Sequence, residues 1–198
     1  MLKIGITGGI GSGKTLICKV FEKLGMPVFY ADYAGKEVLN WKETRVELEK
    51  YFGKEVFYDD QSVNKSKIAE IVFNNKDKMN VLNSIIHPKV QDLYENWLKT
   101  LTGAPYAIRE AAIMIESGSY KDLDELILVT APKDDRIKRI IERDKISKEE
   151  VISRMQNQLS DEEKRKYVDH EIVNDGKQMI LPHILQIHQN FTDVSEYN

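Results

Sequence analysis

The sequence has little cysteine and no strong excess of charge, and both scarcities exclude kinds of site. Its one cysteine, Cys18, permits no intramolecular disulfide and no metal cluster built from cysteines. We interpret Cys18 as a small core residue rather than a reactive thiol, as expected for a protein of the reducing cytoplasm. The formal net charge of −3 provides no general basic field that would attract nucleic acid or an anionic membrane.

Long apolar runs are also missing. No stretch approaches the ~20 apolar residues of a membrane-spanning helix, and the first residues carry no signal-peptide pattern. The chain has 198 residues, 41% hydrophobic and 31% charged, which is typical of a globular protein with one sizeable core and a small additional lobe. We therefore expect a cytoplasmic protein that binds neither membrane nor nucleic acid.

A glycine-rich motif is the most informative feature that is present. Residues 8–15 read Gly-Gly-Ile-Gly-Ser-Gly-Lys-Thr and follow an apolar run, residues 2–6, that is typical of a buried strand. The glycines let backbone N–H groups face phosphate oxygens, while Lys14 can reach the β- and γ-phosphates and the Thr15 hydroxyl can bind Mg²⁺. Residues 16–24 repeat apolar side chains at helical spacing, so a helix should begin here with its anion-favouring N-terminus. The alternative is a tight turn that binds no ligand. It would not explain why the glycines, the adjacent Lys-Thr pair and the flanking strand and helix patterns occur together, so we predict nucleotide binding.

The remaining segments indicate alternating strands and helices. Short apolar runs typical of strands lie at residues 27–30, 104–108, 126–130 and 171–174. Helical periodicity dominates between the first two runs, where His87-Pro88 should kink or restart a helix. These elements predict a three-layer α/β/α fold with a parallel sheet of about five strands, a helical lobe and a helical lid.

Helices are also expected in the later part of the chain. Two charged helices should occupy the stretch between Pro132 and Arg165, with capping boxes at Ser147 and Ser160. A terminal helix should cover residues 179–187, with a possible bend at its proline, and the polar tail from residue 190 should fray.

Asp32 is a candidate catalytic residue because it directly follows the second predicted strand. Ligands of open parallel sheets bind beyond the carboxyl ends of the strands, so its carboxylate could face the γ-phosphate. There it could accept a proton from an attacking hydroxyl or help to hold Mg²⁺. The alternative is that Asp32 only caps the following helix.

In the order of its motifs, the chain resembles the dephospho-CoA kinases, which phosphorylate the ribose 3′-hydroxyl of dephospho-CoA in the last step of coenzyme A synthesis. The resemblance spans about residues 1–190. It rests on residues 6–15, Ala31-Asp32, Ile86-His87-Pro88, Glu116, Arg139, Arg143-Asp144, Arg154, Gln158 and residues 169–176. The phosphate loop is generic, whereas the middle and late motifs in this order are specific.

The resemblance implies a division of the chain and a set of site residues. A P-loop nucleotide-binding core would comprise residues 1–35 and 103–198, with a lid at about 133–165, and residues 36–102 would form a helical CoA-binding insertion. ATP would bind Gly11, Ser12, Gly13, Lys14, Thr15, Leu16 and Arg143, with Thr15 as the Mg²⁺ ligand. The residues implied to act in catalysis are Asp32, Lys14 and Arg139, and those implied to contact the substrate are Asp32, His87, Glu110 and Glu116.

Some positions depart from the family pattern. Tyr30 stands where many relatives carry the first aspartate of an Asp-x-Asp motif, so any role of that carboxylate is missing or replaced. Residues 112–115 replace a proline-containing segment, which keeps the apolar packing but not the backbone stiffness. Glu110 or Glu116 could contact magnesium or substrate, and either could instead pair with a lid arginine. His87 and the arginines could also be structural or solvated residues.

The mechanism that we expect is in-line transfer of the ATP γ-phosphoryl group to an acceptor hydroxyl. Three alternatives remain: another small-molecule or nucleoside monophosphate kinase, a nucleotide-dependent switch, and a nucleic-acid-binding ATPase. A missing Asn-Lys-x-Asp guanine motif argues against the switch, and the missing positive charge argues against the ATPase. We expect a monomer or a weak homo-oligomer.

Overall fold

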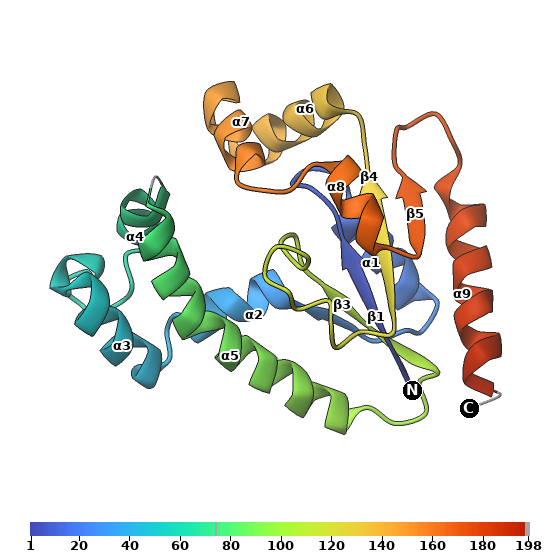
Figure 1. Ribbon diagram of the computed structural model, residues 1–198, viewed down its shortest axis with the longest axis horizontal. Helices are drawn as coiled ribbons and strands as arrows, with labels where there is room; N and C mark the ends of the chain where they lie inside the picture. The colour runs from blue at the N-terminus through green and yellow to red at the C-terminus, as the bar shows by residue number, and fades with distance from the viewer. Residues whose placement is uncertain (74, 197–198) are drawn as a thin grey trace. The chain divides into compact units, whose positions relative to one another are not determined.

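The computed structural model describes residues 1–73 and 75–196, and the chain divides into two compact units (Figure 1). The first unit combines residues 1–30 with residues 101–198, and the second comprises residues 31–100. The helical second unit is therefore inserted into the chain of the first. No helix in the described ranges combines the length and apolarity that crossing a membrane requires.

The first unit is built on a parallel sheet of five strands, as the sequence predicted. The strands are β1 (Leu2–Thr7), β2 (Val28–Tyr30), β3 (Tyr106–Glu110), β4 (Glu125–Thr130) and β5 (His170–Val173). Their order is β2-β3-β1-β4-β5, and every neighbouring pair is parallel. Strands β1 and β4 consist mostly of apolar residues because a parallel sheet is covered on both faces, whereas β3 ends in the buried Arg109 and Glu110. All five strands thus end at the same edge, where β1 leads into the phosphate loop.

Two helices cover one face of this sheet. They are α1 (Lys14–Lys23) and α9 (Ile180–Glu196), whose apolar stripes meet β1 and β3 in a core containing Phe21, Tyr106 and Phe191. The opposite face is met by the segment that follows β3, since Met114 and Leu123 approach β1 there. The short helix α8 (Asp161–Lys164) and the 3-10 turn η2 (Arg165–Tyr167) pack against this segment, and Tyr167 contacts Tyr120 edge to face.

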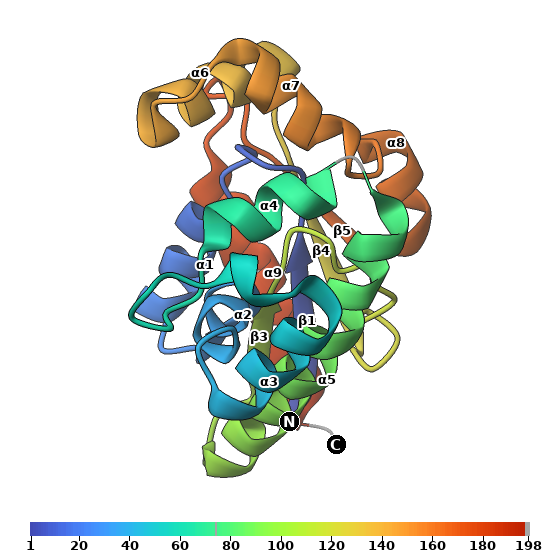
Figure 2. The same cartoon turned by 90° about the vertical axis from the view of Figure 1, so that its left-hand side faces the viewer.

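The predicted lid contains two further helices, α6 (Lys133–Asp144) and α7 (Lys148–Gln156). Figures 1 and 2 show both helices beyond the carboxyl end of β4. They share a small core of their own around Ile137, Ile140 and Val151. The capping boxes at Ser147 and Ser160 are both formed, so these helix starts were correctly read from sequence.

The terminal helix is longer than the sequence suggested. The expectation that the chain frays from residue 190 is wrong for residues 190–196, because α9 continues to Glu196 and buries Phe191 against Tyr106; residues 197–198 lie outside the described ones. Pro182 is the third residue of α9, where its missing N–H leaves no intrahelical hydrogen bond unmade. Tertiary burial here outweighs the polar composition of the tail.

The second unit consists of helices around a separate core. Its elements are α2 (Ala31–Val38), α3 (Lys42–Phe52), the 3-10 turn η1 (Lys54–Val56), α4 (Lys65–Phe73) and α5 (Lys76–Thr100). Its core contains Leu48, Phe52 and Ile85. Pro88 lies inside α5, so the helix does not restart there. Helices α2, α3 and α4 all pack on α5, and these contacts offset the hydrogen bond that proline removes.

Candidate active site

The phosphate loop connects β1 to α1 and has the backbone geometry that its glycines predict. Gly13 caps the N-terminus of α1 with a φ of 100°, a left-handed conformation that other residues rarely adopt. Because α1 starts here, its unpaired N–H groups and its dipole favour an anion in front of the loop. Ser12 is fully buried, and its hydroxyl makes no hydrogen bond to any residue that the structure describes. Such a buried polar atom fits a loop that receives a polar ligand.

Lys14 is held at the base of the loop. Its ammonium group donates to the carbonyl of Gly8 at 3.0 Å and lies 3.8 Å from Oε1 of Glu110. Both side chains are nearly buried, with exposed fractions of 9% and 7%, so their charges act in a weakly screened environment. Glu110 reaches this position because β3 lies between β1 and β2. The strand order thus brings Glu110, rather than a residue of β2, beside the strand that leads into the loop.

Arg139 of the lid also contacts the phosphate loop. Its guanidinium donates to the carbonyls of Gly11 at 3.3 Å and Ser12 at 3.4 Å, and to the carbonyl of Asn174 at 3.0 Å. The side-chain amide of Asn174, just after β5, donates to Ser12 at 2.8 Å. Three separate segments of the first unit therefore meet at Ser12. The predicted site included Arg139 but missed Asn174, which the sequence indicated only as the last residue of a predicted strand and as part of the family-like segment 169–176.

Two more residues at the phosphate loop were absent from the predicted site. Arg136 of α6 donates through Nε to the carbonyl of Ile10 at 3.0 Å. Gln158, after α7, accepts the N–H of Ile10 at 2.8 Å. Gln158 belonged to the motifs of the family resemblance, but nothing in the sequence indicated which group it would contact.

The remaining predicted residues of the first unit lie in different environments. Thr15 and Leu16 are exposed in the first turn of α1. Arg143 is mostly exposed and pairs with Asp144, 2.7 Å away, and Arg154 approaches the same carboxylate at 3.5 Å. Their contacts with ATP stay predictions.

Glu116 pairs with a lysine and not with a lid arginine. Its carboxylate lies 3.0 Å from the ammonium of the fully buried Lys164, and it accepts the N–H of Leu159 at 2.9 Å. The contact of Glu116 with substrate stays a prediction.

Asp32 and His87 both belong to the second unit. Asp32 lies exposed in the first turn of α2, which begins at Ala31, and it is therefore inside the helix rather than at its cap. His87 is half-buried in α5, directly before Pro88. Helices α2 and α5 pack against each other, which brings the two predicted residues onto neighbouring helices. Their catalytic and substrate-binding roles stay predictions.

Burial shifts the pKa of two groups that the sequence singled out. It raises the pKa of the Cys18 thiol far above its usual range, and the nearby Glu110 carboxylate adds to this. Cys18 is fully buried in the core, which fits a structural residue. Burial also raises the pKa of Tyr30, whose hydroxyl donates to Glu22 of α1 at 3.1 Å. At the first position of the Asp-x-Asp motif, the chain thus carries a neutral phenol tied to α1.

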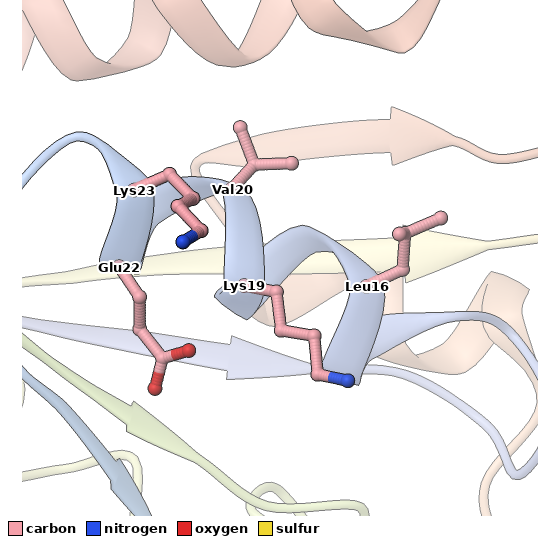
Figure 3. Close-up of a pocket in the computed structure, with 5 residues that line it drawn as sticks. All are labelled: Leu16, Lys19, Val20, Glu22 and Lys23. Carbon is pink, nitrogen blue, oxygen red and sulfur yellow. The ribbon is translucent and has the colours of Figure 1, made fainter.

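A surface hollow of about 470 Å³ runs along the outer side of α1 (Figure 3). It is lined by Leu16, Lys19, Val20, Glu22 and Lys23. Of the predicted phosphate-binding residues it includes Leu16 alone. We therefore place the candidate active site at the loop, where Lys14 and Arg139 converge, and not in this hollow.

Comparisons with known proteins identify the family of the chain. The profile of the dephospho-CoA kinase family matches residues 2–179. The dephospho-CoA kinase of Bacteroides fragilis is 36% identical over 187 residues, which are 94% of this chain and 91% of the relative. Among solved structures, TT1252 from Thermus thermophilus is 30% identical with a TM-score of 0.86 over 96% of both chains. The dephospho-CoA kinase from Campylobacter jejuni is 28% identical with a TM-score of 0.68, covering 99% of this chain and 98% of its own. The chain therefore belongs to the dephospho-CoA kinase family.

Proposed function

We propose that this protein transfers the γ-phosphoryl group of ATP to the ribose 3′-hydroxyl of dephospho-CoA, giving coenzyme A and ADP. The observation that carries the proposal is the buried ammonium of Lys14 at the base of the phosphate loop, beside the carboxylate of Glu110. A fixed cation at this point stabilises charge on a transferring phosphoryl group. Membership of the family supplies the acceptor.

ATP binds in this proposal with its phosphates along residues 11–16. The backbone N–H groups at the start of α1 and the buried hydroxyl of Ser12 are the donors available to the phosphate oxygens. Arg139 already contacts the loop, and its planar guanidinium is suited to pair with phosphate. Arg143, more exposed on the same helix, would join when the lid closes over ATP.

Magnesium fits the site as an ion carried by ATP. Among the residues that the structure describes, no group of three or more His, Cys, Asp or Glu side chains is arranged to hold a metal by itself. Mg²⁺ prefers oxygen ligands and commonly keeps several waters and phosphate oxygens. The exposed hydroxyl of Thr15, one residue after Lys14, would be a protein ligand for it. Bound there, the ion would neutralise charge on the phosphates.

Residues of the second unit act on the acceptor in this proposal. Residues 36–102 bind the CoA moiety, with His87 contacting the substrate. Asp32 orients the 3′-hydroxyl and accepts its proton, since its carboxylate is exposed in the first turn of α2. Glu110 of the first unit, buried beside Lys14, also contacts the substrate in this proposal. We further propose a cytoplasmic protein that is a monomer or a weak homo-oligomer.

A turnover assay tests the proposed function. Purified protein with ATP and Mg²⁺ is offered dephospho-CoA, a panel of nucleoside monophosphates, or no acceptor, and ADP release is measured. We expect ADP release that depends on dephospho-CoA and a product phosphorylated at the 3′ position. Equal release without acceptor would favour an ATPase or a switch, and release with a monophosphate alone would favour another kinase.

A further inference from the structure

The backbone of Ile10, in the phosphate loop, is held at both its N–H and its carbonyl. Its N–H donates to Oε1 of Gln158 at 2.8 Å, and its carbonyl accepts from Nε of Arg136 at 3.0 Å. The Ile10 side chain packs against the apolar core of α6 and α7, which contains Ile140 and Val151. The backbone and the side chain of this residue are therefore both fixed by segments more than a hundred positions later in the chain.

The side chain of Arg136 is in turn held in place by an ion pair with Asp161. NH1 of Arg136 lies 3.3 Å from Oδ2 of Asp161, and the two side chains are 12% and 22% exposed. The guanidinium passes so close to Gly9 that a Cβ there would overlap NH2 of Arg136. A partly buried ion pair of this kind depends on both partners, since removal of one leaves the other charge poorly solvated. Asp161 thus holds Arg136 against the loop.

Gln158 is anchored through its neighbour in the chain. The N–H of Leu159 donates to Glu116 at 2.9 Å, and the same carboxylate lies 3.0 Å from the ammonium of Lys164. Lys164 is fully buried and also donates to the carbonyl of Ala112 at 3.0 Å. The segment that carries Gln158 and Asp161 is therefore fastened to the chain that follows β3.

We infer that residues 158–164 form a brace that holds the backbone of Ile10 in the phosphate-binding conformation, with Gln158 and Asp161 as positioning residues for ATP. The brace is fastened to Glu116 through Leu159 and Lys164 and contacts Ile10 through Gln158, so it links the chain after β3 to the phosphate loop. Glu116 acts in it by holding the brace and not by touching substrate. The inference rests on the proposed function and concerns the binding of ATP, not the binding of the acceptor.

The physical reason is that phosphate binding needs successive N–H groups of the loop to face the same anion. If the backbone at Ile10 can rotate, the loop must become ordered when ATP binds. The entropic cost of that ordering weakens the affinity for ATP. Loss of one neutral hydrogen bond changes an equilibrium by about fivefold. The effect should fall on ATP binding, whereas acceptor binding should be unaffected.

The test uses Gln158→Met, which keeps the side-chain length but removes the acceptor oxygen. We expect the Kd for MgATP, measured by titration calorimetry, and the KM for ATP to rise by about fivefold. The KM for dephospho-CoA and the melting temperature should stay near those of the wild type. Gln156→Met, at an exposed position two residues earlier, is the matched control and should change none of these quantities.

Two further variants keep the inference open to refutation. Asp161→Asn should reproduce the selective rise in the ATP constants, because it weakens the hold on Arg136. The double variant Glu116→Gln, Lys164→Met leaves no unpaired buried charge and should also raise the KM for ATP alone. A rise in the KM for dephospho-CoA alone would overturn the assignment of Glu116, and wild-type ATP affinity in all variants would overturn the brace. If the wild-type protein binds MgATP but does not phosphorylate dephospho-CoA, the proposed function fails while the binding test of the brace still stands.

Discussion

Replacing Gly13 by alanine tests how tightly the phosphate loop is enclosed. Gly13 has a φ of 100°, and a Cβ at this position would overlap the side-chain amide of Asn174. That amide donates to the carbonyl of Ser12 at 2.8 Å. The substitution therefore combines backbone strain with the loss of a hydrogen bond that joins β5 to the loop.

Both contributions can be given a magnitude. A residue other than glycine in a left-handed conformation costs about 1–2 kcal/mol, and a displaced neutral hydrogen bond costs about 1 kcal/mol. The total of about 2–3 kcal/mol should lower the melting temperature by roughly 4–12 °C in a chain of this size. Because the overlap displaces Asn174 from Ser12, the affinity for MgATP should also fall.

Thermal unfolding without nucleotide measures the first effect, and titration calorimetry with MgATP measures the second. Gly25→Ala is the matched control, since Gly25 has a similar φ of 87° but no atom within 4 Å of the added Cβ. Gly25→Ala should be destabilised by the backbone strain alone, so its loss of unfolding free energy should be about 1 kcal/mol smaller than that of Gly13→Ala. If both variants melt at the same temperature and bind MgATP equally well, the contact between Asn174 and Ser12 contributes nothing and the reasoning is wrong.

Three further outcomes are expected. Lys14→Met should reduce kcat by about 10²- to 10³-fold, since it removes the cation beside the phosphates; single-turnover assays with near wild-type rates would contradict this. Asp32→Asn should lower kcat by about 10²- to 10⁴-fold without changing the calorimetric affinity for ATP, and a variant with unchanged kcat would remove Asp32 from the role of base. Hydrogen bonding to Arg165 lowers the pKa of Glu171 below its usual 4.5, so the pair stabilises the fold above that pH and loses this effect as the pH falls through the lowered value. Glu171→Gln should therefore melt below the wild type at pH 7, and the difference should disappear once the pH has fallen below the lowered pKa of Glu171; a difference that persists in stronger acid would refute the assignment.

Much of the architecture was predictable because its signals are local. The phosphate loop between a strand and a helix is a contiguous motif, and the capping boxes at Ser147 and Ser160 are complete within four residues. The five strands were recognisable from short apolar runs, because strands buried on both faces are rich in apolar residues. In each case, the residues that determine the backbone conformation are neighbours in the chain.

Other features were decided by the tertiary structure. The strand order inserts β3 between β1 and β2, and this brings Glu110 to 3.8 Å from Lys14. Phe191 extends the terminal helix because it packs on Tyr106 of the sheet. Gln158 meets Ile10 across 148 positions of sequence. A side-chain contact over such a separation depends on how the helices and strands pack, so the motif alone determined that a phosphate loop exists, and packing determined which side chains hold it.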